Sequence, residues 1–327
     1  MKPGNEQFRS ILILALVNVG IILALSFLSP TFLTYENFLS VLKRMSELGM
    51  LAIAETIVFI SGGFDLSIGT VMAISGLITG QMYILGLPFF LCVLLALLGG
   101  MAAGLMNALF IVKLRLQPFI VTLATMSILR SIVYGVLRGK TLSHFPESYL
   151  AYGDVIILGL PFLFIVLVIF AVLATLFLQR TYVGRHIYAV GGNERSAYLS
   201  GISVNRIKYT VYILSGLICA CAGLLFSIRI RAVIPDAGLN SPLEVVTAVV
   251  IGGTAITGGK GTIVGSLLGV LALFLLTNGF SLLNLNPFWQ LVVLGLLLIY
   301  VVGREGISKA LIGKRLKKKS HQSAGIE

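Results

Sequence analysis

Four ionisable residues stand inside or beside long apolar runs of this sequence, namely Glu55, Asp65, Arg130 and Glu244. Ionisable groups at membrane depth are costly, so they usually face protein or water, where they can contact a solute, couple an ion or gate a path. The alternative role is structural, for instance Asp65 capping a helix or pairing with Arg130. Both roles stay open for Asp65, Arg130 and Glu244, whereas Glu55 is harder to explain structurally.

Two glycine motifs with one pattern, [ST]-G-G-x5-G-[ST], occupy residues 61–70 and 257–266. Each follows a short apolar run and opens a longer one. Interrupted helices at corresponding places in two halves indicate a transport pathway, although small residues also serve plain helix packing in membranes. With acids nearby we favour the pathway. The candidate pathway and gating residues are Glu55, Ser61, Gly62, Gly63, Asp65, Ser67, Arg130, Glu244, Thr257, Gly258 and Gly259.

The longest polar interval, residues 179–208, carries five basic residues against one acid, Glu194. The pattern predicts a short helix, Glu194–Ser200, with Asn193 as its N-cap. We expect Gly191 and Gly192 to bend the chain through positive φ angles, and Ala197 to allow close approach to a groove. Such a projecting helix suits docking, whereas charge alone favours a solvated loop that only sets topology.

Composition places these features in a membrane. Of 327 residues, 57% are hydrophobic and 11% charged, whereas soluble domains are about a quarter charged. Long apolar runs without strand alternation predict an all-α polytopic protein. The net charge of +12 fits the positive-inside rule, so nucleic acid is not expected as a partner.

We expect one transmembrane domain, residues 1–327, with about ten helices. The expected spans are 11–28, 47–60, 66–85, 88–112, 119–137, 158–178, 209–228, 243–256, 262–283 and 288–302. An amphipathic piece, 38–46, is expected in the outer interface. Basic residues then place both termini, the 179–208 loop and the tail 303–327 in the cytoplasm. Lys43, Arg44, Arg229 and Arg231 fall outside, where they either dock a soluble partner or are simply solvated.

No catalytic motif is present. The sequence lacks GxxxxGK[ST], a nucleophile elbow and HExxH, so we expect neither an enzyme nor an ATPase site of its own. The scattered histidines and the cysteines in apolar runs lack metal-ligand spacing, and no metal or cofactor is expected.

Several blocks resemble a known family. They are LAIAETIVFISGGFDLSIGTVMA (51–73), QPFIVTLATMSILRS (117–131), VGRHIYAVGGNERSAYLSGISVNRIK (183–208) and LEVVTAVVIGGTAITGGKGTIVGSLLG (243–269). They are similar to permease subunits of bacterial ATP-binding-cassette (ABC) importers of the ribose/galactose/autoinducer-2 class, over nearly the whole chain. Phe64 stands where the family usually has Ile. Glu55 stands where the family varies, which links it weakly to solute choice.

The resemblance implies a type II importer fold in the bacterial cytoplasmic (inner) membrane. It implies a permease dimer, of two copies or with a paralogue, a separate cytoplasmic ATPase pair that binds ATP, and a periplasmic or lipid-anchored binding protein. Ribose, other pentoses, galactose, allose, autoinducer-2 and nucleosides are compatible solutes. The coupling segment would comprise Gly184, Arg185, Gly191, Gly192, Asn193, Glu194, Ala197, Ser200 and Gly201. It would transmit ATP-driven movement to the two glycine motifs by alternating access.

Two other classes of function are weighed against this one. An ion-coupled secondary transporter would use Glu55, Asp65 or Glu244 as its coupling site. A membrane-bound enzyme or receptor is disfavoured, because the sequence has neither a catalytic constellation nor a sensory domain.

Overall fold

The computed structural model describes residues 5–286 and scattered positions from 288 to 303. The α-helices are α1 (Asn5–Leu28), α2 (Tyr35–Ile60), α3 (Ile68–Ile84), α4 (Phe89–Lys113), α5 (Pro118–Leu137), α6 (Glu147–Leu150), α7 (Phe162–Arg180), α8 (Tyr182–Gly192), α9 (Glu194–Leu199), α10 (Val204–Ile230), α11 (Ser241–Ile251) and α12 (Ile263–Leu282). A 3-10 turn, Ala151–Gly153, and a small antiparallel hairpin of β1 (Ile156–Ile157) and β2 (Leu160–Pro161) complete the described elements.

Six of these helices are long and apolar enough to cross a membrane, namely α1, α4, α5, α7, α10 and α12. α3 and α11 are apolar but shorter, with 17 and 11 residues. The prediction of a helical polytopic membrane protein is therefore confirmed. The expected tenth span, 288–302, and the basic tail, 303–327, lie outside the continuously described residues.

α2 corrects the sequence analysis, because it is one helix of 26 residues rather than an interfacial piece, 38–46, followed by a short span, 47–60. It begins after Thr34, whose side chain accepts a hydrogen bond from the Asn37 N–H. No proline or glycine follows until Gly49, so nothing interrupts the helix where the break was expected. Its last turns, from Leu48 to Ile60, are fully enclosed by protein.

The break before α12 also differs from the prediction. α11 ends at Ile251 and not at Ile256, because the chain turns at Gly252 and at Gly253, whose φ is +85°. Thr257 therefore lies in the turn beyond α11, while Ser61 directly ends α2. The two motifs share a sequence pattern but occupy different positions relative to their helix ends.

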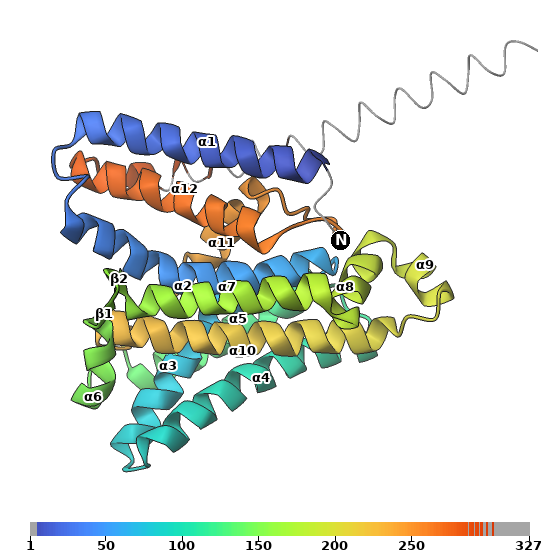
Figure 1. Cartoon of the computed structure of the whole chain (residues 1–327). Coiled ribbons are helices and arrows are strands. Elements are labelled where there is room, and N and C mark those ends of the chain that lie inside the picture. Colours follow the sequence, from blue (N-terminus) through green and yellow to red (C-terminus); the bar gives the residue numbers. More distant parts are fainter. Residues whose placement is uncertain are drawn as a thin grey trace, which may run out of the picture.

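α10 forms the centre of the molecule and packs against α2, α3 and α4 (Figure 1). The contact with α4 is a close one: a Cβ at Gly104 would lie 2.1 Å from the Tyr212 carbonyl oxygen, and one at Gly216 would lie 2.1 Å from that of Gly100. Small residues allow such backbone contact between membrane helices. α1 pairs with α12 on one flank, and α7 lies along α2.

The two ends of the helix bundle carry different elements. Figure 1 shows α8 and α9 projecting at one end, and α6 with the β1–β2 hairpin at the other. The predicted docking segment and the loop of residues 138–161 therefore lie at opposite ends.

Candidate functional site

The three Gly-Gly pairs singled out in the sequence meet at one place, which we call the glycine junction. It comprises Gly62, Gly191, Gly192, Gly258 and Gly259 with the carbonyl of Ile60. A Cβ at Gly258 would lie 2.6 Å from the Gly191 oxygen, and one at Gly259 would lie 2.7 Å from Gly192 Cα. The junction thus brings together the ends of α2 and α8 and the turn between α11 and α12.

Backbone atoms make the contacts of the junction. The Gly259 N–H donates to the Ile60 carbonyl over 2.9 Å. A Cβ at Gly191 would lie 1.8 Å from the same oxygen, so no residue with a side chain fits there without displacing α2 or α8. The Tyr188 hydroxyl adds a 2.9 Å hydrogen bond to the Gly261 carbonyl. α8 is therefore attached to both interrupted segments.

The role expected for Gly191 and Gly192 is corrected in part. Both lie at the end of α8, and neither has a positive φ, unlike Gly201, whose φ is +80°. Gly191 is required for close approach instead of for a bend. Gly184 acts in the same way, since a Cβ there would lie 2.4 Å from the Phe177 and Leu178 oxygens at the end of α7.

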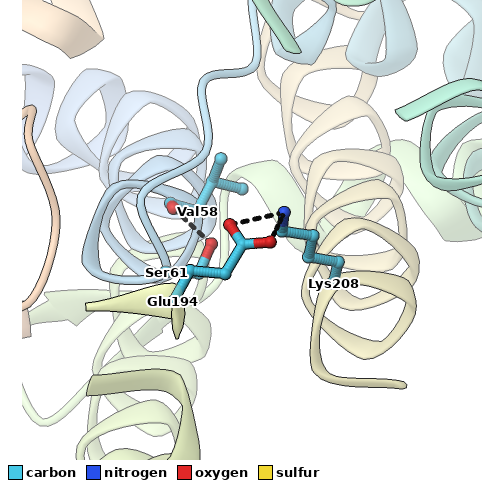
Figure 2. Close-up of polar contacts among 4 residues, drawn as sticks. All are labelled: Val58, Ser61, Glu194 and Lys208. Atoms are coloured by element: carbon cyan, nitrogen blue, oxygen red, sulfur yellow. Dashed lines mark hydrogen bonds and ion pairs between the residues drawn. The ribbon is translucent and has the colours of Figure 1, made fainter. Parts of the chain in front are cut away.

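The predicted short helix is present as α9, and its predicted cap is confirmed. The Asn193 side chain accepts a hydrogen bond of 2.8 Å from the Ser196 N–H. Glu194 then pairs with Lys208 of α10, with Oε2 at 2.8 Å from Nζ, which fixes α9 against α10. Figure 2 shows this pair, together with the Ser61 hydroxyl turned back to the Val58 carbonyl, 2.7 Å away.

The outward face of α9 differs from the one expected. Ala197 is 4% exposed and packs inward, so it does not offer a surface for close approach. Tyr198 and Leu199 are 71% and 76% exposed instead. Arg185 and Arg195 are also exposed, and the Ser200 hydroxyl bonds back to the Ser196 carbonyl.

Asp65 lies in a buried network of hydrogen bonds just before α3. Its Oδ1 accepts from the N–H and the hydroxyl of Ser67, at 2.9 and 2.5 Å, and its Oδ2 accepts from Ser215 at 3.2 Å. Asn107 donates to the Ser67 oxygen at 3.0 Å and accepts from Thr125 at 2.6 Å. The network connects α4, α5 and α10 to the start of α3, which is a structural role for Asp65.

Glu55 stands beside this network inside α2 and is fully buried. Its Oε1 accepts a 3.2 Å hydrogen bond from the Asp65 N–H, whereas Oε2 has no hydrogen-bond partner. A buried oxygen without a partner is costly and calls for an explanation, such as a solute or a water that binds there. The Tyr212 hydroxyl holds the same loop from α10, through the Phe64 N–H and carbonyl at 3.3 Å each.

Arg130 does not pair with Asp65. It donates hydrogen bonds of 2.9 and 2.7 Å to the carbonyls of Pro235 and Ala237, and so it anchors the loop between α10 and α11. Glu244 lies partly buried in the first turn of α11, where the charges of Arg44 and Glu47 act on it. The structure thus brings Glu55, Asp65 and Ser67 together and leaves Arg130 and Glu244 apart from them.

Three of the four expected docking cations have acidic partners in the chain. Arg229 forms a two-pronged pair with Glu47, at 2.8 and 2.5 Å, while Arg231 and Lys43 both pair with Asp154. Arg44 stacks 5.9 Å from the centre of the Phe274 ring.

Sequence reasoning missed several residues of these networks. Asn107, Ser215 and Glu47 are polar residues within helices, and that signal could have identified them as candidates. Their partners could not be found in the sequence, because they lie on other helices.

Comparison with known proteins identifies the family. Residues 37–302 match the family described as "Branched-chain amino acid transport system / permease component". The ribose import permease RbsC of Bacillus subtilis (strain 168) is 37% identical over 86% of this chain and 88% of its own. The fructose import permease FrcC of Rhizobium meliloti is 34% identical, over 89% and 82%. The D-allose permease AlsC of Escherichia coli (strain K12) is 31% identical, over 92% and 93%. No solved structure was found to match. The chain therefore belongs to this family of transport-system permease components.

Proposed function

We propose that this chain is the permease subunit of an ABC importer that carries a ribose-like monosaccharide across a bacterial cytoplasmic membrane. The names of its relatives support the sugar class, since the similar proteins import ribose, fructose and allose. A separate binding protein would supply most of the selectivity among these sugars. A separate ATPase pair would bind ATP and drive transport.

The glycine junction is the observation that carries this proposal. A transport subunit without an ATPase site must receive movement from outside the membrane. α8 and α9 project from the bundle (Figure 1), and α8, which leads directly into α9, touches the end of α2 and the turn before α12 through backbone atoms. Backbone contacts leave little slack, because no flexible side chain stands between the parts. Movement of α9 would therefore reach both interrupted segments.

Tyr198 and Leu199 are the residues that we propose for docking of the ATPase. Two large, exposed side chains at the tip of the molecule mark a contact site. Replacement of Tyr198 by Ser should reduce co-purification of the ATPase at least tenfold. The control is Tyr182→Ser, which removes a similarly exposed tyrosine at the start of α8 and should leave co-purification unchanged. Normal assembly of the Tyr198→Ser protein would contradict this role. Ala197→Trp is a poorer test, because that residue is buried.

The gate, in this proposal, is the loop from Ser61 to Ser67. It is held by Glu55, Asp65 and Tyr212, and it follows the helix end that α8 contacts. Displacement of that end would open the network and expose the Glu55 carboxyl to a sugar hydroxyl, for which a carboxylate is a good acceptor. The Glu55→Gln protein should then transport with altered apparent affinity for sugar while keeping its fold.

The remaining features follow the same proposal. We propose ten spans, a permease dimer, and cytoplasmic termini with α8 and α9 on the same side, supported by the basic excess there. Arg44 and Arg231 are the cations best placed to receive an acidic binding protein, because both are exposed. Steering by such charges is screened by salt.

Uptake of labelled ribose tests the central claim. Cells without their own ribose uptake would express this permease with its ATPase and binding protein. Uptake should disappear when the ATPase's phosphate-binding lysine is replaced, and should survive an uncoupler of the proton gradient. Uptake that survives loss of the ATPase and fails with the uncoupler would favour the ion-coupled alternative. If the protein takes up fructose or allose but not ribose, the proposed substrate changes and the proposed mechanism does not.

A further inference from the structure

A groove of about 900 Å³ opens beside α9. It lies between the end of α4, the turn into α5, α9 and the first turns of α10. Its polar lining includes Lys113, Arg115, Arg195, Lys208 and Glu194, together with Tyr198, the side chain proposed above for docking of the ATPase. We call it the basic groove. None of the contacts described for the glycine junction or the Asp65 network uses it.

The basic groove carries uncompensated positive charge. Its acid, Glu194, is neutralised by Lys208, at 2.8 Å. The side chains of Lys113, Arg115 and Arg195 form no hydrogen bond or ion pair in the part of the chain that the structure describes, and all three residues are exposed. Three cations therefore face the groove without an anion.

Arg115 is held in an unusual conformation. Its φ is +54°, in the left-handed region that residues other than Gly, Asn and Asp seldom adopt. This conformation turns the chain between α4 and α5, a task for which glycine is the easier residue.

One flank of the basic groove is apolar. Ile111, Val112, Leu116 and Pro118 line it, from the end of α4 and the turn into α5, and Leu116 is 45% exposed. α4 and α5 are both candidate membrane spans, so these side chains lie at the level where a span meets the membrane surface. The groove thus joins three unpaired cations to apolar side chains at the ends of two candidate spans.

We propose that the basic groove binds the headgroup of an anionic phospholipid. The phosphate would lie between Lys113, Arg115 and Arg195, and the acyl chains would run along α4 and α5. Basic pockets at the ends of membrane helices are suited to such headgroups. An acidic surface of a soluble protein would also meet the cations, but it would leave the apolar flank unmatched, so the lipid is the better fit.

Lipid binding to the purified full-length permease tests the proposal without any transport measurement. The probes are phosphatidylglycerol and phosphatidylcholine, titrated in neutral detergent at low salt and counted by native mass spectrometry. Each basic residue near an anionic headgroup contributes about a fivefold gain in affinity. Three of them should make the wild-type protein prefer phosphatidylglycerol by about a hundredfold.

Two matched triple variants distinguish the effect of the charges in the basic groove from the effect of the net charge of the protein. Lys113→Gln with Arg115→Gln and Arg195→Gln should reduce the preference to within a few-fold. Arg138→Gln with Lys140→Gln and Arg180→Gln removes three exposed charges outside the groove and should keep it. The single variants Arg115→Gln and Arg195→Gln, each with about a fivefold loss, give the same answer if the triple variant folds poorly.

Three results would overturn the proposal. One is equal binding of the two lipids by the wild-type protein, and another is an equal loss in both triple variants. The third combines two observations: the groove variant keeps its lipid preference, and it no longer co-purifies with the ATPase in phosphatidylcholine nanodiscs. That result would assign the groove to a protein partner. Failure of ribose uptake would contradict the proposed function but would not bear on the lipid proposal, because lipid binding is measured without transport.

Discussion

Replacement of Gly191 by Ala tests the glycine junction with the smallest possible change. The added Cβ would lie 1.8 Å from the Ile60 oxygen and 2.8 Å from the Gly259 nitrogen. Both are backbone atoms, so no side chain can rotate away to make room. The end of α2 and the end of α8 must separate by more than about 1 Å before the contact becomes acceptable.

The magnitude follows from three contributions. Overpacking of this kind costs about 1–3 kcal/mol. Loss of the Gly259–Ile60 hydrogen bond, 2.9 Å long in the native protein, costs about 1 kcal/mol more. Replacing a helical glycine by alanine returns up to about 1 kcal/mol. The free energy of unfolding should therefore fall by about 1–3 kcal/mol, which a membrane protein of ordinary stability survives.

The neighbouring glycine provides the control. A Cβ at Gly192 would meet nothing within 4 Å, so Gly192→Ala should be neutral or slightly stabilising. Both variants would be purified with the ATPase and assayed for thermal unfolding, sugar-stimulated ATP hydrolysis and uptake in proteoliposomes. Gly191→Ala should assemble normally, keep basal hydrolysis, and lose at least tenfold in stimulated hydrolysis and uptake.

Two outcomes would refute this reasoning. Normal coupled uptake by the Gly191→Ala protein would mean that the backbone contact transmits nothing. Equal losses in both variants would mean that the end of α8 tolerates no change at all, so that the particular contact with Ile60 would not be the cause.

Three other predictions concern the buried network, the outer ion pair and the topology. Asn107→Leu, of similar volume, should lower the free energy of unfolding by about 2–4 kcal/mol, because it leaves the buried Thr125 hydroxyl without its partner and removes one of the hydrogen bonds of the Ser67 hydroxyl; unchanged thermal stability would contradict the network. Glu47→Gln and Arg229→Gln should each destabilise the protein by about 1–3 kcal/mol, and the double variant by less than their sum; additive losses would count against the pair. A cysteine placed at Glu194 should react in intact cells only with membrane-permeant reagents, and labelling by an impermeant reagent would reverse the proposed orientation.

Local chemistry made part of the site predictable. Asn193 was identified as an N-cap from its type and its place before a short helical stretch, because capping depends on neighbours in sequence. The breaks at residues 61–63 and before α12 were predicted from glycine content, and the apolar runs predicted the helices. The end of α11 was misplaced because Gly252 and Gly253, which end it, received less weight than the motif that follows.

The contacts between distant segments could not be predicted. Nothing in the sequence indicates that Gly191 meets Ile60 or that Tyr212 holds Phe64, since these contacts depend on how whole helices pack. The direction of Ala197 was wrong for a related reason: a small residue in a polar stretch suits an open surface and a tight internal contact equally well. The continuity of α2 was missed because Lys43, which pairs with Asp154 of a distant loop, was assigned to the membrane surface.

The continuity of α2 has a thermodynamic consequence. At about 1.5 Å per residue, its 26 residues extend about 39 Å, which exceeds the roughly 30 Å of the hydrocarbon layer. One stiff body therefore pairs with Arg229 at its middle, through Glu47, and reaches the glycine junction at its end. Binding free energies coupled through one body are reciprocal. A ligand that binds the outer part of α2 and favours one position of the helix must change the affinity of a second ligand at the α8–α9 end. The second ligand must change the affinity of the first by the same factor. The effect of the binding protein on ATPase affinity and the effect of the ATPase on binding-protein affinity would then be one quantity, measurable from either side of the membrane.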